Sequence, residues 1–473
     1  MMTAATSIRT AIIPDRVTIA RGEGGDALDL KAICIFAATG FFLGEDTYYA
    51  NERALQPATD HELDHHGRVR SAKPYWRWHH TPRDLTLAQA TEEFAAVFER
   101  ITREQTANAQ VILPLSGGLD SRTQAVALRG SRNVQTYSYG FADSFDETGY
   151  GQRIADRLGF EFRRFEISAG YLWRVIDELA RLNGCYADFT HPRQMAVIDE
   201  LKPLGDLFFL GHWGDVLFDD MGVESNLSIR DQASVVVGKI VKKGGVELAS
   251  TLWQAWGLEG SFEAFLRDRV TALLQAIDIA DANARIRAFK SLYWAPRWTT
   301  ANLVTFSSRR PIALPYYHDA MCKLVCTFPE RLLAKRQIQI EYIKRYAPQV
   351  ARVAWQTYDP LDLYSYKRYF TARMLPYRAL RKLAETVRRR WTGTTLVTRN
   401  WELQFLGREN EEQLRAHLFE QRDFGALVPR SLVDRFYAKF CEEDRVKYAH
   451  PVSMLLTLSM FARTRRDRSI SLV

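Results

Sequence analysis

Cysteine is scarce in this chain: 473 residues include only five, and no two of them form a CxxC pair. A CxxC pair is typical of zinc sites and of dithiol redox sites. Cys322 and Cys326 stand four residues apart and could share one face of a helix, but small buried apolar side chains are the simpler interpretation. The sequence therefore predicts neither a disulfide framework nor a zinc centre.

Long hydrophobic runs are also absent. The longest candidate, residues 32–43, falls short of the roughly 20 residues that cross a bilayer and contains Gly40. Residues 1–21 mix polar and apolar side chains without the continuous apolar core of a signal peptide. Hydrophobic residues make up 47% of the chain and charged residues 25%, as in ordinary globular proteins. We therefore expect a cytoplasmic protein of two or three domains.

Three zones follow one another along the chain. Residues 1–85 are mixed in pattern and close on the turn-rich, aromatic stretch SAKPYWRWHHTP. Over residues 86–350, strand-like runs alternate with helical patterns, which indicates βαβ units around a buried parallel sheet. Residues 351–473 look mostly helical, with prolines as breaks. We predict an α/β protein with a parallel sheet and a mostly helical C-terminal region.

The stretch LPLSGGLDSR, residues 113–122, joins a predicted strand, AQVILPLS, to a predicted helix, LDSRTQAVALRG. Ligands of parallel α/β sheets sit at the carboxyl ends of the strands. Glycines let the backbone approach an anion, and the helix N-terminus offers unpaired N–H groups and the positive end of a dipole. A serine hydroxyl can donate to a phosphate oxygen. We predict a pyrophosphate cradle made by Ser116, Gly117, Gly118 and Ser121.

Asp120 within this loop predicts a bound cation. A carboxylate beside phosphates is unfavourable unless a cation bridges them, and Mg²⁺ is the natural cation for oxygen ligands. The loop is not a Walker loop, which needs GxxxxGK[ST]. A helix-capping role is the alternative for Asp120.

The motif LSGGLDS resembles the PP-loop of the ATP-pyrophosphatase group, in its asparagine-synthetase branch. Later stretches are similar to segments of that family in the same order: YSYGFADSFDETGYGQRIADRLG with Asp146 and Glu147, then FLGHWGDVLFDD, RRPIALPYYHDAM and HPVSMLLTLSMFAR. The resemblance covers residues 31–465, and its first motif is the most specific. It implies an adenine nucleotide alpha hydrolase-like fold, with an ATP-binding synthetase domain over residues 86–350.

The resemblance implies an AMP-forming ligase of the asparagine synthase type that uses ATP and Mg²⁺. A carboxylate attacks the α-phosphorus of ATP, pyrophosphate leaves, and ammonia or an amine then displaces AMP to give an amide. Preorganised donors and a cation suit the charge that gathers on the leaving pyrophosphate. By position in the family, Asp120 and Asp215 would hold Mg²⁺, although a turn role for Asp215 stays open. The residues expected near the nucleotide are Leu115, Tyr139, Leu210 and Gly211.

The N-terminal zone departs from the glutamine-hydrolysing relatives. These carry a catalytic Cys directly after Met1, within a large amidohydrolase domain, whereas this chain begins Met-Met-Thr. The stretch GFFLGEDTYYANERALQPATDHEL, followed by KPYW, is similar to the closing part of that domain. We therefore expect residues 1–85 to be a remnant without glutaminase function. Nitrogen would come from free ammonia, from a substrate amine or from a separate glutaminase.

Single side chains depart from the family pattern as well. His212 stands where the family often has Glu, or Tyr in β-lactam-forming relatives, and imidazole titrates near neutrality. A general base for the amine, a ligand contact and a packing role are all open for it. Trp213 replaces a glycine of the same motif. Arg122, a second catalytic candidate, could hold a phosphate or the substrate carboxylate, or pair with an acid on a neighbouring helix. The family's late catalytic Lys has no match near VAWQTYDP.

The acceptor stays open: aspartate, which would mean asparagine biosynthesis, and a sugar or peptide carboxylate are equally compatible with the sequence. Arg309 and Arg310 suit an anionic acceptor, with a structural ion pair as the alternative. A nucleotide-binding relative without catalysis is the main alternative function. The stretch 361–390, with nine Lys/Arg against two acids, suggests a tRNA target or a weak contact with an anionic membrane surface. Because no RNA-binding motif accompanies it, we expect no nucleic-acid partner.

Overall fold

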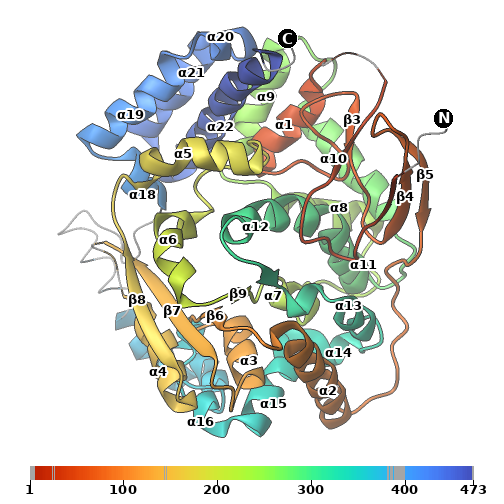
Figure 1. Ribbon diagram of the computed structural model, residues 1–473, viewed down its shortest axis with the longest axis vertical. Coiled ribbons are helices and arrows are strands. Elements are labelled where there is room, and N and C mark those ends of the chain that lie inside the picture. The colour runs from red at the N-terminus through yellow and green to blue at the C-terminus, as the bar shows by residue number, and fades with distance from the viewer. Residues whose placement is uncertain are drawn as a thin grey trace.

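The computed structural model contains a parallel β-sheet with helices on its faces and a largely helical layer beside it (Figure 1). It describes residues 6–23, 25, 27–142, 144, 146–380, 383, 387 and 400–470, the last five of these by backbone alone. The sheet has the strand order β10-β9-β6-β7-β8, and every neighbouring pair is parallel. Its strands are β6 (Val111–Pro114), β7 (Val134–Phe141), β8 (Glu161–Ile167), β9 (Leu207–Phe209) and β10 (Ile312–Ala313).

Helices connect these strands as the alternating pattern predicts. Helix α3 (Leu119–Ala127) follows β6, α4 (Thr148–Leu158) follows β7, and α5 (Tyr171–Asn183) with α6 (Ile198–Leu201) follows β8. Helix α4 ends at Gly159, whose φ of +71° is one that glycine adopts without strain. The predicted α/β class with a parallel sheet is thus confirmed, and the sheet strands that the sequence indicated over residues 111–209 lie where expected.

The strand order reverses direction between β6 and β9. From β6 the chain proceeds outward to β7 and β8, then returns to the other side of β6 for β9 and continues to β10. Such a reversal opens a crevice beyond the carboxyl ends of the two central strands, because their connections leave in opposite directions. The loop after β6 carries Ser116 and the loop after β9 carries His212. The topology therefore brings the two motif loops together.

Helix α2 (Leu87–Thr106) leads into the sheet. It begins at Thr86 with a capping box, in which the threonine side chain accepts from the Gln89 backbone N–H and the Gln89 side chain receives the Thr86 N–H. Phe94 and Phe98 on its apolar face are fully buried. The helix packs against α3 and against α15 (Gln337–Tyr346). Helices α2, α3 and α15 thus pack on one another.

The helical layer combines distant parts of the chain (Figure 1). Its members are α1 (Leu30–Thr39), α8 (Ile229–Ile240), α9 (Gly245–Ala255), α10 (Phe262–Gln275), α19 (Arg408–Phe419), α20 (Arg422–Leu427), α21 (Arg430–Ala438) and α22 (Arg445–Ile470). Helices α1 and α9 approach so closely that a Cβ on Gly245 would overlap the Ala38 carbonyl oxygen. Helix α22 packs against α1, α9, α20 and α21. The predicted helical character of the C-terminal region is confirmed for the residues described.

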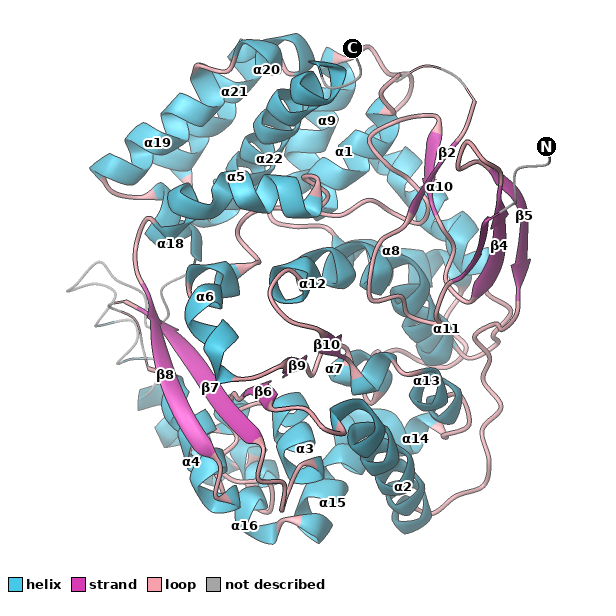
Figure 2. Ribbon diagram, in the orientation of Figure 1, coloured by secondary structure: helices cyan, strands magenta, loops and turns pink. Residues whose placement is uncertain are grey.

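The N-terminal segment adds small antiparallel sheets beside this layer (Figure 2). One consists of β1 (Thr6–Arg9), β4 (Thr59–Leu63) and β5 (Val69–Pro74), and the other of β2 (Ile19–Arg21) and β3 (Glu52–Ala54). None of the five cysteines, all of which lie within the described residues, is in a disulfide bond, and Cys326 donates to the Cys322 carbonyl oxygen one helical turn back, at 3.3 Å. Over the described part of the chain, no helix has the length and apolarity that a membrane crossing requires.

Candidate active site

A cavity of about 740 Å³ lies at the carboxyl ends of β6, β7 and β9. It is large enough for a nucleotide together with a second substrate, since small-molecule sites span roughly 300–1,000 Å³. Its wall comes from the loop after β6, the loop after β9, and the π-helical segment η3 (Lys290–Thr299). The predicted residues that line it are Leu115, Ser116, Gly118, Asp120, Ser121, Tyr139, Gly211, His212 and Asp215.

The loop after β6 presents an uncapped helix to the cavity. Gly118 is the N-cap residue of α3, and no side chain caps the helix there. The first N–H groups of α3 are therefore open to an anion, at the positive end of the helix dipole. Ser116 and Ser121 close the loop on itself, with their hydroxyl oxygens 3.1 Å apart. Ser116 also accepts the Gly118 N–H at 3.3 Å.

Gly117 has no room for a side chain. A Cβ at this position would stand 2.6 Å from the Cβ of Gln356 and 2.9 Å from the ring of Tyr150. Gln356 belongs to the VAWQTYDP stretch and itself lines the cavity. The VAWQTYDP stretch, near which the resemblance places the family's late Lys, therefore reaches the cavity. Its side chain there is the amide of Gln356 and not an ammonium group.

Arg122 does not line the cavity and donates to backbone carbonyls, which differs from the phosphate and carboxylate roles expected for it and from the alternative of a pair with an acid. The side chain is 0% exposed, and its guanidinium donates to the carbonyl oxygens of Val353 at 2.9 Å, Ala354 at 2.9 Å and Gly117 at 3.2 Å. Burial lowers its pKa to about 10. The physical reason for the difference is that Arg122 lies on the buried side of α3, so it ties the loop to the 353–356 segment.

Asp120 is the most constrained carboxylate of the site. It lies in the first turn of α3 and receives hydrogen bonds from Arg336 and, at 3.1 Å, from the Gln339 amide. A Cβ on Gly214 would overlap Oδ1 of Asp120, so the carboxylate abuts the residue before Asp215. Burial raises the pKa of Asp120, with Arg336 opposing and Asp215 adding to the rise. Two carboxylates and one guanidinium thus share this corner of the cavity.

The loop after β9 is strained at Trp213, where φ is +78°. A bulky residue rarely adopts this left-handed conformation, which explains why the family has glycine here. The indole is held by burial, with 7% of the residue exposed, and by an Nε1 hydrogen bond to Ser291 Oγ at 3.2 Å. The turn consequently presents His212 to the cavity. Within the described residues Nδ1 of His212 is buried without a hydrogen-bond partner, and burial lowers its pKa to about 4.

The segment η3 supplies the far wall of the cavity. The Lys290 ammonium lies 5.8 Å from the Trp213 ring centroid and 5.2 Å from that of Trp294, within range of cation–π attraction. Burial lowers the pKa of Lys290. Several buried polar atoms of cavity residues lack a partner among the residues described: Arg193 Nε, His212 Nδ1, Trp294 Nε1, Trp298 Nε1 and Thr299 Oγ1. This wall is rich in unused hydrogen-bonding groups.

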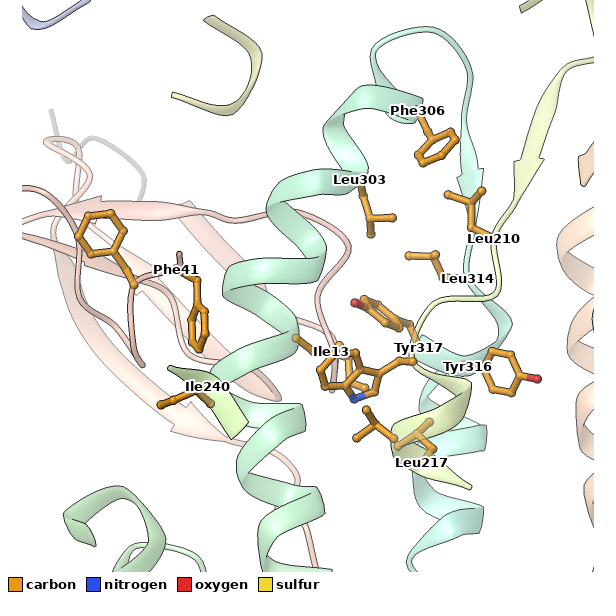
Figure 3. Packing of buried hydrophobic residues seen from close by; sticks show 14 of the residues in the cluster. Ile13, Phe41, Leu210, Leu217, Ile240, Leu303, Phe306, Leu314, Tyr316 and Tyr317 are labelled. Atoms are coloured by element: carbon orange, nitrogen blue, oxygen red, sulfur yellow. The ribbon is translucent and has the colours of Figure 1, made fainter. Parts of the chain in front are cut away.

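Leu210 and Gly117 complete the predicted set but do not line the cavity. Leu210 is fully buried and packs with Phe306 of α12 (Thr300–Ser307) and with Leu314 (Figure 3). Arg309 pairs with Glu178 at 2.9 Å and Asp199 at 2.7 Å, so the structural ion pair describes it. Arg310 likewise donates to a backbone carbonyl, that of Gly205.

Sequence reasoning missed several residues of the cavity. Arg336 lies in LLAKRQIQI, a stretch with no distinguishing motif, and reaches Asp120 only through the fold. The residues of η3 carry one usable signal, because two tryptophans within five residues, Trp294 and Trp298, together with Trp213 are unusual for a purely structural helix. The lining residues outside the sequence prediction that bear polar groups include Glu147, Arg193, Gln194, Lys290, Thr299, Arg336 and Gln356.

The fold is an α/β fold of the PP-loop type, with the cavity at the carboxyl ends of its parallel strands. Residues 93–288 match the family model described as asparagine synthase. No curated protein matches the chain. Among matching solved structures, glutamine-dependent NAD⁺ synthetase from Acinetobacter baumannii in complex with ADP is 18% identical, over 38% of this chain and 40% of that chain. The TM-score between the two structures is 0.21.

Proposed function

We propose that this protein is an ATP-dependent, AMP-forming amide ligase that adenylates a carboxylate and then transfers the acyl group to ammonia or an amine. The observation that carries the proposal is the juxtaposition of the uncapped N-terminus of α3 with Asp120 and Asp215 at the reversal point of the sheet. Residues 86–350 would form the ATP-binding domain, residues 1–85 a remnant of an amidohydrolase domain, and residues 351–473 a helical cover.

In the first step an oxygen of the acceptor carboxylate bonds to the α-phosphorus of ATP, and the bond to the bridging oxygen of pyrophosphate breaks. The N–H groups of α3, with Ser116 and Ser121, would hold the departing pyrophosphate, since they are preorganised where negative charge gathers. Arg336 lies beside Asp120 and supplies a fixed positive charge. Tyr139 and Leu115, which both line the cavity, would flank the adenosine.

Asp120 and Asp215 are suited to hold Mg²⁺. Carboxylate oxygens together with phosphate oxygens are the ligands that this ion prefers. The described residues contain no group of three or more His, Cys, Asp and Glu that could hold a metal alone, so the phosphates would have to complete the site. A bound Mg²⁺ would neutralise charge on the phosphates.

In the second step the nitrogen nucleophile bonds to the acyl carbon, AMP leaves, and one proton must leave the nitrogen. His212 is the candidate to receive it, because burial keeps the imidazole neutral at pH 7 and Nδ1 carries no partner among the residues described. A pKa of about 4 makes it a weak base. The unused donors of η3 suit an acceptor with several oxygen atoms, such as a sugar or peptide carboxylate, as well as aspartate.

The bond that ATP loses distinguishes this reaction from phosphoryl transfer. We would incubate the protein with ATP, Mg²⁺, ammonium and a set of aspartate, uronic acids and short peptides, and follow phosphorus-31 NMR. AMP and pyrophosphate formed together with one acceptor are the expected products. ADP and phosphate in their place would contradict the proposal.

The pairing of Arg336 with Asp120 favours a second candidate, a nucleotide-binding protein without catalysis. The guanidinium occupies one oxygen of the carboxylate that a catalytic cation would need. That protein would bind ATP tightly and release neither AMP nor pyrophosphate with any acceptor.

A further inference from the structure

A second cavity, of about 510 Å³, lies on the other face of η3 from the candidate active site. Lys290, Trp294 and Trp298 face the first cavity, whereas Tyr293 and Arg297 of the same segment face the second. Its remaining wall comes from the N-terminal segment and from α10. The apolar side chains of this wall are Leu55, Trp76, Trp78, Leu273, Ile277 and Leu292.

Arg297 is the unusual member of this cavity. The residue is 4% exposed, and Nη2 donates to the Asp46 carbonyl oxygen at 2.6 Å. Its Nε and Nη1 are buried, and no group in the described part of the chain pairs with them. Trp78 is 6% exposed, and its indole Nε1 is also buried without a hydrogen-bond partner among the described residues. A buried donor without an acceptor lowers the stability of the fold, and the free-energy cost is largest when the donor belongs to a charged group.

Two of the three acids that line the cavity are already engaged by other groups. The Asp46 carboxylate accepts from Arg269 at 2.9 and 3.0 Å, and Glu45 accepts from Gln56. Four arginines against three acids line the cavity, which leaves one formal positive charge: Arg53, Arg77, Arg269 and Arg297 against Glu45, Asp46 and Asp278. This balance matches a ligand with a single negative charge better than it matches a phosphate dianion.

We propose that this cavity binds a small organic carboxylate, whose anionic head accepts from Arg297 and Trp78 and whose apolar or aromatic body packs against the tryptophan and aliphatic wall. The volume is in the range of small-molecule sites, and such sites combine an apolar wall with a few fixed polar groups. The site is separate from ATP and from its acceptor, because η3 stands between the two cavities.

The probe is 4-fluorophenylacetate, titrated into the full-length protein and followed by fluorine-19 NMR. Its uncharged amide and phenyl phosphate are the matched ligands that vary only the head group. We expect the carboxylate to bind at least about tenfold more tightly than the amide, because a hydrogen bond to a charged group contributes about 1.5–3 kcal/mol. It should also bind more tightly than the phosphate, and saturating ATP should leave its affinity unchanged.

Two variants locate the binding in this cavity. Arg297→Met should weaken the carboxylate at least about tenfold and bring its affinity to that of the amide. Trp78→Phe keeps the ring and removes only the donor, so it should weaken the carboxylate about threefold and remain informative if Arg297→Met fails to fold. Equal binding of carboxylate and amide to the unaltered protein would overturn the proposal. So would the absence of carboxylate binding below about 10 mM, displacement by ATP, or unchanged affinity in a folded variant.

Discussion

Arg336 donates through Nη2 to Oδ1 of Asp120, and the Gln339 amide donates to the same oxygen. The carboxylate that the sequence motif assigns to a cation is therefore already balanced by a guanidinium. Arg336 adopts a left-handed backbone conformation with φ of +60°, directly before α15. Strain of this kind at a non-glycine residue is often found at functional sites.

The first prediction concerns this pair. Replacing Arg336 with Met leaves Asp120 and Asp215 without their shared counter-charge, so we expect pyrophosphate exchange to fall about 100-fold, which corresponds to about 2.7 kcal/mol of transition-state stabilisation. Arg336→Lys should keep part of the rate. Steady-state exchange with each variant checks this, with Arg9→Met, at an exposed ion pair with Asp60, as the control for a lost surface charge. Full activity in Arg336→Met would show that the guanidinium has no role in the step.

The second prediction concerns His212 and acid stability. Burial lowers its pKa from an ordinary 6.5 to about 4. Between pH 6.5 and pH 4 the imidazole is therefore protonated in the unfolded chain and neutral in the folded chain. The stabilising contribution is complete above pH 6.5 and is lost as the pH falls toward 4. As the pH falls from 6.5 to 4, the unfolding free energy of His212→Gln should therefore decrease less steeply than that of the unaltered protein. The difference in slope should be up to about 1.4 kcal/mol per pH unit.

Urea denaturation from pH 7 to pH 4.5 measures that slope. His450 is also buried with a pKa of about 4, so its contribution persists in both proteins and the comparison isolates His212. Identical slopes would mean that His212 titrates normally.

The third prediction concerns the strained Trp213. Glycine would relieve its left-handed backbone by about 1 kcal/mol, but deleting a buried indole costs about 3–5 kcal/mol. We expect Trp213→Gly to lower the unfolding free energy by about 3 kcal/mol, measured by urea denaturation. A stabilised variant would indicate that the indole contributes little packing and that backbone strain dominates.

The fourth prediction concerns Arg122. Removing its guanidinium leaves the carbonyls of Val353, Ala354 and Gly117 without their donor, which should destabilise the fold by about 3 kcal/mol. Because the loop then loses its tie to the 353–356 segment, Arg122→Met should also raise the KM for ATP. Thermal unfolding and exchange kinetics check the two effects. Lower activity at unchanged stability and unchanged KM would instead indicate direct chemistry by Arg122.

The sequence was most informative where local chemistry determines structure. SGGLDS between a strand and a helix predicted the loop, and the alternating pattern predicted β6 to β9 with their helices. Contacts that depend on tertiary packing were not accessible. Nothing near Arg336 marks it as the partner of Asp120, and nothing near Arg122 shows which face of α3 it occupies. The basic stretch 361–390 falls partly outside the described residues, and the tRNA and membrane alternatives that it raised stay predictions.

ATP–pyrophosphate exchange tests adenylation at the loop of residues 115–122 most directly. With Mg²⁺ and a panel of aspartate, uronic acids and short peptides, we expect exchange with one carboxylate. Asp120→Ala should abolish it, while Asp60→Asn, at an exposed strand position, should leave it intact. If ATP binds and none of the carboxylates supports exchange, or if exchange persists in Asp120→Ala, the proposed reaction at this site is contradicted.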